Sequence, residues 1–112
     1  MGEHEKLVIV DDDPQVLRFL RKKGELNGHR IVGEAQSRAD VLDLLHSAEL
    51  DFSVAIVDDL HGQGKEVAEI LKGANPKATI IAHTSMVSHP FGDMLVEKPD
   101  PGGTLWEKIV QL

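Results

Sequence analysis

Side chains that can take part in chemistry stand at the ends of four short apolar runs of this sequence. In chain order they are Asp11–Asp13, Asp58–Asp59, Thr84–Ser85 and Lys98. If the four runs are parallel strands of one sheet, their carboxyl ends meet at the same edge, and the polar groups lie together. The sequence therefore predicts a small pocket that holds several carboxylates, a hydroxyl and an ammonium group.

We expect a cation in this pocket, because carboxylates that are forced together repel one another. The candidate ligands are carboxylate oxygens, which favour Mg²⁺. An aspartate held beside Mg²⁺ can attack a phosphorus atom and form an aspartyl phosphate. The ion and Lys98 would offset the charge of the phosphoryl oxygens, and Thr84 would donate a hydrogen bond to one of them.

Strands and helices are expected to alternate along the chain. The expected strands are Leu7–Val10, Ile31–Ala35, Val54–Val57, Thr79–His83 and Met94–Glu97. The first and third are continuous apolar runs, which are typical of strands buried on both faces of a parallel sheet. Apolar residues at helical spacing follow four strands, and these helices begin near Pro14, Ser37, Gly64 and Thr104. We expect Ser37 to cap the second helix and the first helix to bend or fray at Gly24. The pattern predicts a doubly wound α/β fold with a five-stranded parallel sheet.

The connection between the fourth and fifth strands is too short for a crossover helix. Only nine residues, Ser85–Asp93, separate Thr84 from the expected fifth strand. A helix that runs back along a strand of about 17 Å needs about eleven residues at 1.5 Å each. We therefore expect the fourth helix of the fold to be shortened or absent.

A missing helix would leave part of the sheet near Ile81 and Leu95 without cover, and such apolar patches are usually interaction surfaces. We predict a homodimer or a partner complex through the fourth and fifth strands and the last helix. The alternative is that Phe91 and Met86 fill the gap within a monomer.

The four strand ends resemble those of the receiver domains of two-component response regulators. Leu7–Pro14 resembles the opening strand of that family with its acidic pair, and Val57–Asp58 resembles the phosphoacceptor position. Thr84–Ser85 resembles the switch hydroxyl with its small neighbour, and Lys98–Pro99 resembles a lysine before a proline whose peptide bond is often cis. The resemblance spans nearly the whole chain, in the order found in that family. It implies the flavodoxin-like strand order 2-1-3-4-5.

The resemblance also implies roles for individual residues. Asp58 would accept a phosphoryl group from a histidine kinase or a histidine phosphotransfer protein. Asp12 would bind Mg²⁺ directly, Asp11 directly or through water, and Asp58 would complete the metal site. Such a chain is a phosphoacceptor with at most slow self-dephosphorylation, and not an enzyme.

Two departures from the family favour an alternative function. These are the shortened fourth-helix region and Leu95, which stands where the family often has a tyrosine or phenylalanine that moves with the switch hydroxyl. The loop after Asp58 also lacks the usual Met-Pro step. The alternative is a pseudo-receiver that binds proteins without being phosphorylated. A phosphohydrolase is disfavoured, because Leu60 occupies the position of the acid that it would need.

Several of the polar residues also have an ordinary structural explanation that needs no functional role. Asp13 is also explained as the N-cap of the first helix, and Asp59 is expected to point away from the pocket. The six histidines have no metal-ligand spacing and are expected to lie at the surface or to be hydrogen-bonded in place. Among them, His61 is close enough in sequence to Asp58 to face the phosphate.

The composition excludes several classes of function. A net charge of −7 argues against nonspecific nucleic-acid binding. The chain has no cysteine, which excludes disulfides and thiol chemistry, and no apolar run approaches the length of a membrane span. We expect one domain, residues 1–112, that acts in the cytoplasm without nucleic acid or membrane as a partner.

Overall fold

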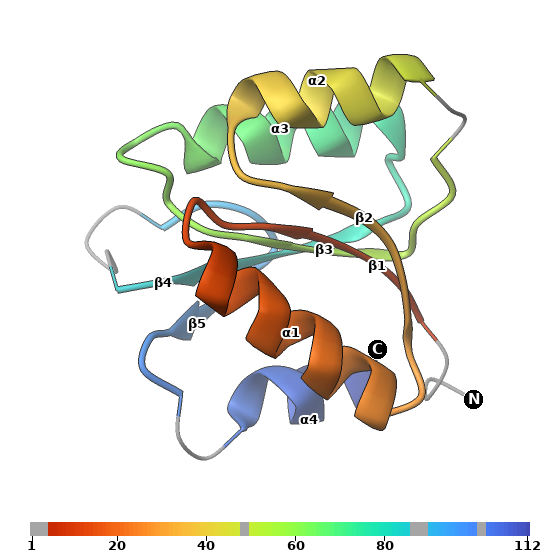
Figure 1. Cartoon of the computed structure of the whole chain (residues 1–112), viewed down its shortest axis with the longest axis vertical. Helices are drawn as coiled ribbons and strands as arrows, with labels where there is room; N and C mark the ends of the chain where they lie inside the picture. The colour runs from red at the N-terminus through yellow and green to blue at the C-terminus, as the bar shows by residue number, and fades with distance from the viewer. Residues whose placement is uncertain (1–4, 48–49, 86–89, 101–102) are drawn as a thin grey trace.

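The computed structural model describes residues 5–47, 50–85, 90–100 and 103–112. Its elements are β1 (Lys6–Val10), α1 (Pro14–Leu26), β2 (Arg30–Ala35), α2 (Arg38–Ser47), β3 (Val54–Val57), α3 (Gly64–Ala74), β4 (Thr79–Thr84), β5 (Met94–Glu97) and α4 (Thr104–Val110). The five strands form one parallel sheet in the order β2-β1-β3-β4-β5, which confirms the expected order. Helices α2 and α3 cover one face of the sheet, and α1 and α4 cover the other (Figure 1).

The apolar runs of β1 and β3 divide between the two faces because successive side chains of a strand point to opposite sides. Leu7 and Ile9 pack with Leu17 of α1 and Ile109 of α4. Val8 and Val10 belong to the other core cluster, which includes residues of α2 and α3. Strands β1 and β3 are therefore buried on both faces of the sheet, as the sequence predicted.

The strand register brings the polar strand ends together. Val10 pairs with Val57, so Asp11 and Asp58 follow paired residues of adjacent strands. The amide of Asp58 also donates to the carbonyl of Val10 at 2.9 Å. Thr84 at the end of β4 pairs with Glu97 at the end of β5, and Lys98 is the next residue. The pocket predicted from the sequence is thus assembled at one edge of the sheet.

We had expected α1 to bend or fray at Gly24, but helical structure continues through this residue to Leu26. Gly24 is buried where the helix approaches the sheet closely. A Cβ atom at this position would lie 3.0 Å from Ile31 Cδ1 and 3.4 Å from Leu7 Cδ1. The glycine therefore leaves room for the side chain of Ile31 within the helix.

No helix occurs between β4 and β5 among the described residues of that connection, 85 and 90–93. The predicted plug residue Phe91 is buried and belongs to the core cluster on the α2 and α3 side. Its ring lies over Gly64 at the start of α3, where an added Cβ would approach Phe91 Cζ to 2.7 Å. Met86, the other proposed plug residue, lies outside the described residues.

A carboxylate holds the rest of the segment 90–93, which we call the β4–β5 segment. Asp93 Oδ2 accepts hydrogen bonds from the Ile80 amide at 2.8 Å and from Lys72 Nζ at 2.9 Å. The same Lys72 also donates to the carbonyl of Ala78. These contacts join the segment to β4 and α3.

The expectation of an exposed apolar patch near Ile81 is wrong. Ile81 is fully buried and packs on the α1 and α4 side of the sheet, where the helices remain. Leu95 is half-buried and packs against the opposite cluster. The homodimer through β4, β5 and α4 stays a prediction.

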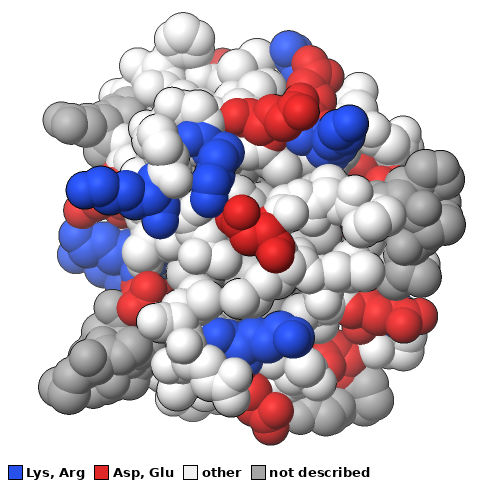
Figure 2. Space-filling view, turned by 180° about the vertical axis from the view of Figure 1, so that it is seen from behind, with Lys and Arg blue, Asp and Glu red and all other residues white. Residues whose placement is uncertain are grey.

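The molecular surface carries charges of both signs. On the face opposite to that of Figure 1, basic and acidic side chains are interspersed with uncharged surface between them (Figure 2). Within the described ranges, no helix is both long and apolar enough to cross a membrane.

Candidate functional site

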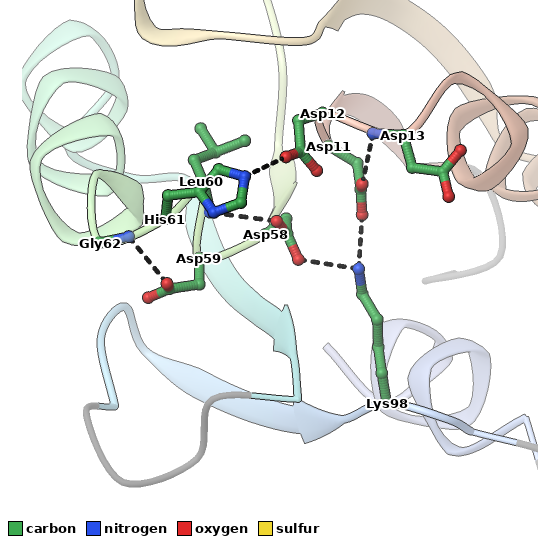
Figure 3. A network of polar contacts seen from close by, with 9 residues as sticks. All are labelled: Asp11, Asp12, Asp13, Asp58, Asp59, Leu60, His61, Gly62 and Lys98. Carbon is green, nitrogen blue, oxygen red and sulfur yellow. Dashed lines mark hydrogen bonds and ion pairs between the residues drawn. The ribbon is translucent and has the colours of Figure 1, made fainter.

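Three carboxylates meet at the carboxyl ends of β1 and β3. Asp11, Asp12 and Asp58 each bring one oxygen to a position within 4.8 Å of the others. We call these three residues the carboxylate cluster. They are the residues that the sequence predicted as metal ligands, and the close-up in Figure 3 shows Asp11 and Asp58 turned toward the same point.

Lys98 places its ammonium group between two of these carboxylates. Its Nζ lies 2.6 Å from Asp11 Oδ2 and 2.8 Å from Asp58 Oδ1 (Figure 3). The Lys98–Pro99 peptide bond is cis, as the resemblance implied. One ammonium group thus serves two carboxylates that come from strands β1 and β3.

Burial and pairing act in opposite directions on these groups. Burial raises the pKa of Asp11 above its ordinary value of 3.8, although Lys98 and the Asp13 amide both donate to its carboxylate. Burial also opposes the charge of Lys98, but hydrogen bonds to Asp11 and Asp58 outweigh it and raise the pKa of the ammonium group. Lys98 thus pairs with two of the three carboxylates of the cluster.

The donor set of the cluster fits Mg²⁺. Three carboxylates within one ion's reach provide hard oxygen ligands, and their mutual repulsion is relieved by a divalent cation. Asp12 and Asp58 also line an open cavity of about 1070 Å³, which leaves room for water and for a phosphoryl group beside the ion.

The three carboxylates differ in their access to this cavity. The side chain of Asp11 is only 2% exposed, that of Asp58 is 15% exposed, and that of Asp12 is 43% exposed. Asp58 is further oriented by the amide of Leu60, which donates to its Oδ2 at 3.0 Å. Asp58 is therefore both firmly held and open to a reactant.

Thr84 and Ser85 lie where the sequence predicted them, at the end of β4 and against the same cavity. Thr84 is almost fully buried. Phe91 of the β4–β5 segment lines the cavity as well, so this segment borders the site.

The neighbouring aspartates have local structural roles. Asp13 caps α1, because its Oδ1 accepts a hydrogen bond from the Gln15 amide at 2.9 Å. Asp59 turns its Oδ2 to the Gly62 amide at 2.8 Å, away from Lys98, although the residue also borders the cavity (Figure 3).

Two histidines depart from what the sequence suggested. His83 is neither at the surface nor satisfied, since it is buried and its Nδ1 has no partner within the described part of the chain. Burial and the charge of Lys98 lower its pKa to about 4. His61 places Nε2 3.0 Å from Asp12 Oδ2, so it contacts the carboxylate cluster. Proximity to Asp58 in the sequence was the only signal for His61, and no sequence signal marked His83.

The fold is that of response-regulator receiver domains. The receiver domain of PhyR from Erythrobacter litoralis has a TM-score of 0.79 at 20% identity, over 96% of this chain and 88% of that one. The response regulator TrrA from Thermotoga maritima, in complex with Mg²⁺ and BeF, has a TM-score of 0.78 at 22% identity, over 96% and 97%. RcsB from Salmonella enterica serovar Typhimurium, bound to the promoter rprA in the presence of phosphomimetic BeF₃⁻, gives 0.73 at 25% identity, over 96% and 99%.

The sequence itself matches the family model of the TrkA-N domain over residues 1–96, and the chain belongs to that family. No curated protein matches the sequence. The chain spans about half (48%) of the PhyR chain of Bartonella quintana, which it resembles with a TM-score of 0.77.

The residues that follow β1 distinguish two kinds of binding site that doubly wound sheets carry. Dinucleotide-binding sheets of this kind carry a glycine-rich turn, G-x-G-x-x-G, between the first strand and its helix. Here β1 is followed by Asp11–Pro14, and the first glycine after the strand is Gly24. Carboxylates therefore occupy the position where the dinucleotide-binding folds place a phosphate-binding backbone.

Proposed function

We propose that this chain is a phosphoacceptor in two-component signalling that takes a phosphoryl group onto Asp58 with Mg²⁺ in the carboxylate cluster. The observation that carries the proposal is the placement of the Asp58 carboxylate, which contacts Lys98, lies close to Asp11 and Asp12 and is open to the cavity. The receiver fold supports the same conclusion.

The donor would be a phosphohistidine of a kinase or of a histidine phosphotransfer protein. A carboxylate oxygen of Asp58 attacks phosphorus and forms a P–O bond, while the P–N bond breaks and its electron pair stays on the imidazole nitrogen. Lys98 Nζ lies 2.8 Å from Asp58 Oδ1, so it can donate to a phosphoryl oxygen once the phosphoryl group is bound to Asp58. When bound, Mg²⁺ would offset further charge on the phosphoryl oxygens.

Among the three acids of the cluster, burial favours Asp58 as the acceptor. Asp11 is covered on nearly all sides and holds Lys98, so a phosphorus atom cannot reach it without displacing both. Asp12 is accessible, but it pairs with His61 and lies at the outer edge of the cluster. The Leu60 amide and Lys98 hold Asp58 from two sides and leave it open to the cavity.

A pseudo-receiver is the second candidate, and the β4–β5 segment favours it. This segment has no helix in its described residues, and Leu95 of β5 packs into the core in place of a mobile aromatic ring. A protein of this kind would bind its partner through the receiver surface without being phosphorylated.

Intact-mass measurement after incubation with Mg²⁺ and acetyl phosphate separates the two candidates. We expect a stable adduct with the mass of one phosphoryl group, formed only when Mg²⁺ is present. Asp58→Asn should abolish the adduct, because the amide is not a nucleophile for phosphorus.

Asp59→Asn is the matched control, since it changes the neighbouring acid that turns toward Gly62. It should leave most of the adduct in place. An adduct that survives in Asp58→Asn would contradict the proposed acceptor, and the absence of any adduct in the unaltered protein would favour the pseudo-receiver.

A further inference from the structure

A second open cavity lies between α1 and the start of α4, on the face of the sheet that these two helices cover (Figure 1). We call it the α1–α4 cavity. Its volume is about 600 Å³, and pockets that hold small ligands have volumes of roughly 300–1,000 Å³. Its apolar lining comes from α1, α4 and the end of β5, and consists of Val16, Phe19, Leu20, Pro99, Leu105 and Trp106. Such a cavity can enclose the apolar body of a small molecule.

The imidazole of His83 belongs to the wall of this cavity. Side chains two residues apart on a strand share a face, so His83 lies on the same side of β4 as Ile81, which packs toward α1 and α4. His83 is only 7% exposed, and its Nδ1 has no hydrogen-bond partner within the described part of the chain. Buried polar atoms are nearly always hydrogen-bonded, because an unpartnered one is costly. The ring therefore offers a ligand a hydrogen bond that the protein itself leaves unmade.

The charged residues around the α1–α4 cavity are balanced in sign. Its described lining contains two acids, Asp13 and Asp100, and two lysines, Lys23 and Lys98. Both acids already accept hydrogen bonds from amides at the start of a helix. Burial and the charge of Lys98 lower the pKa of His83 to about 4, so its imidazole is neutral near neutral pH. The cavity therefore favours neither an anion nor a cation.

We propose that the α1–α4 cavity binds a small uncharged aromatic molecule with a hydroxyl group, of the phenol class, and that His83 is the hydrogen-bond partner of this hydroxyl. A hydroxyl group both donates and accepts, so it matches either tautomer of a neutral imidazole. The rings of Phe19 and Trp106 in the lining provide aromatic contacts for the ring of the ligand. This site does not depend on the role of Asp58 as phosphoacceptor.

The burial of His83 favours a small ligand over a protein partner. A protein that lay across α1 would contact Phe19, which is 56% exposed, but it would leave the buried imidazole without a bond. A small molecule can fill the apolar space and place its hydroxyl group beside the ring. The hydrogen bond to His83 is therefore the feature that an experiment has to isolate.

Titration of the full chain with para-fluorophenol, followed by fluorine NMR, tests the proposal. Fluorobenzene is the matched probe, because it has the same ring and lacks the hydroxyl group. We expect para-fluorophenol to bind with a dissociation constant of about 1 mM or lower. Fluorobenzene should bind about tenfold more weakly, which is the effect of one typical hydrogen bond. Trp106 is the only tryptophan of the chain, so its indole N–H signal in isotope-labelled protein should shift as the cavity fills.

Three variants separate the hydrogen bond from the apolar contacts. His83→Leu should bind para-fluorophenol about tenfold more weakly and fluorobenzene within about twofold of the unaltered protein. It should melt at the same temperature or higher, because an unpartnered buried polar atom is removed. Phe19→Ala should weaken the binding of both probes by the same factor, since it removes a ring that both contact. Leu26→Ser is the control: Leu26 is 82% exposed and lies outside the described lining, so neither affinity should change.

Absence of binding, an unmoved Trp106 signal, equal affinities for the two probes, or a preference for the hydroxyl group that persists in His83→Leu would each overturn the inference. A Trp106 signal that shifts with protein concentration in the absence of a probe would show that a second copy of the chain occupies the cavity, and this result would overturn it as well. The Asp58 adduct is measured separately, so none of these outcomes bears on the proposed function.

Discussion

The carboxylate cluster and the β4–β5 segment line the same cavity but are held by different forces. In the cluster, three carboxylates lie close together, two of them share Lys98, and the most buried of the three, Asp11, has a raised pKa. In the segment, a buried phenylalanine ring and a doubly hydrogen-bonded carboxylate, Phe91 and Asp93, bind the chain to α3 and β4. The like charges of the cluster repel one another, and a bound cation can relieve this repulsion. The contacts of the β4–β5 segment stabilise the fold without a ligand.

This difference explains how the fold tolerates a connection without a described helix. A parallel sheet needs cover on both faces, and Phe91 with Asp93 provides it at the α3 side of β4. The cluster has no comparable substitute, because any ligand it binds depends on the placement of its particular oxygen atoms. Substitutions in the segment should therefore lower stability, and substitutions in the cluster should change ligand binding and leave the fold in place.

The largest stability effect is expected at Phe91. Phe91→Ala should lower the free energy of unfolding by about 3 kcal/mol or more, because it removes a buried ring and leaves a cavity over Gly64. Urea unfolding followed by the fluorescence of Trp106 measures the change. Phe19→Ala is the matched control: Phe19 is 56% exposed on α1, and its loss should cost within about 0.5 kcal/mol. Equal losses for the two variants would contradict the role of Phe91 as a plug.

The next effect concerns Mg²⁺ and the cluster. Free Mg²⁺ at about 100 times its dissociation constant should stabilise the folded protein by about 2.7 kcal/mol and raise its melting temperature. Asp12→Ala should abolish this response, and without metal the variant should be at least as stable as the unaltered protein, because a like charge is removed. Calorimetric melting with and without Mg²⁺ measures both. A response that is unchanged in Asp12→Ala would place the ion elsewhere.

The smallest effect is expected at Asp93 and depends on pH. Hydrogen bonds from the Ile80 amide and from Lys72 hold the pKa of Asp93 below its ordinary value of 3.8. A carboxyl group whose pKa is lower in the folded state stabilises the fold above its unfolded pKa, and this stabilisation is lost as the pH falls through the folded pKa. Asp93→Asn should therefore cost at most about 1 kcal/mol near neutral pH, because solvent screens a carboxylate that is 43% exposed, and little in acid.

Urea midpoints measured from neutral pH into the acid range check this dependence. Asp51→Asn is the control, because Asp51 pairs with Lys6 at the surface and its loss should cost at most about 1 kcal/mol. A difference between Asp93→Asn and the unaltered protein that does not shrink in acid would contradict the assignment.

Local patterns in the sequence predicted the elements well, because helices and strands are set by apolar spacing and caps. Strands β3 and β5 have the expected bounds, and the other three differ by one residue at one end. Ser37 Oγ accepts a hydrogen bond from the Asp40 amide at the start of α2, as expected of a cap. The meeting of Asp11, Asp58, Thr84 and Lys98 also followed from the sequence, since parallel strands end at one edge.

Only the tertiary structure decided how these residues pair. The bridge from Lys98 to both Asp11 and Asp58, the contact of His61 with Asp12, and the burial of Phe91 join residues that lie far apart in the chain or on irregular loops. Gly24 was misjudged for the same reason, because it leaves room for Ile31 inside a helix that the sequence predicted to bend or fray there. Sequence patterns report the preferences of neighbouring residues, whereas these contacts depend on strand register, loop conformation and the distance between packed elements.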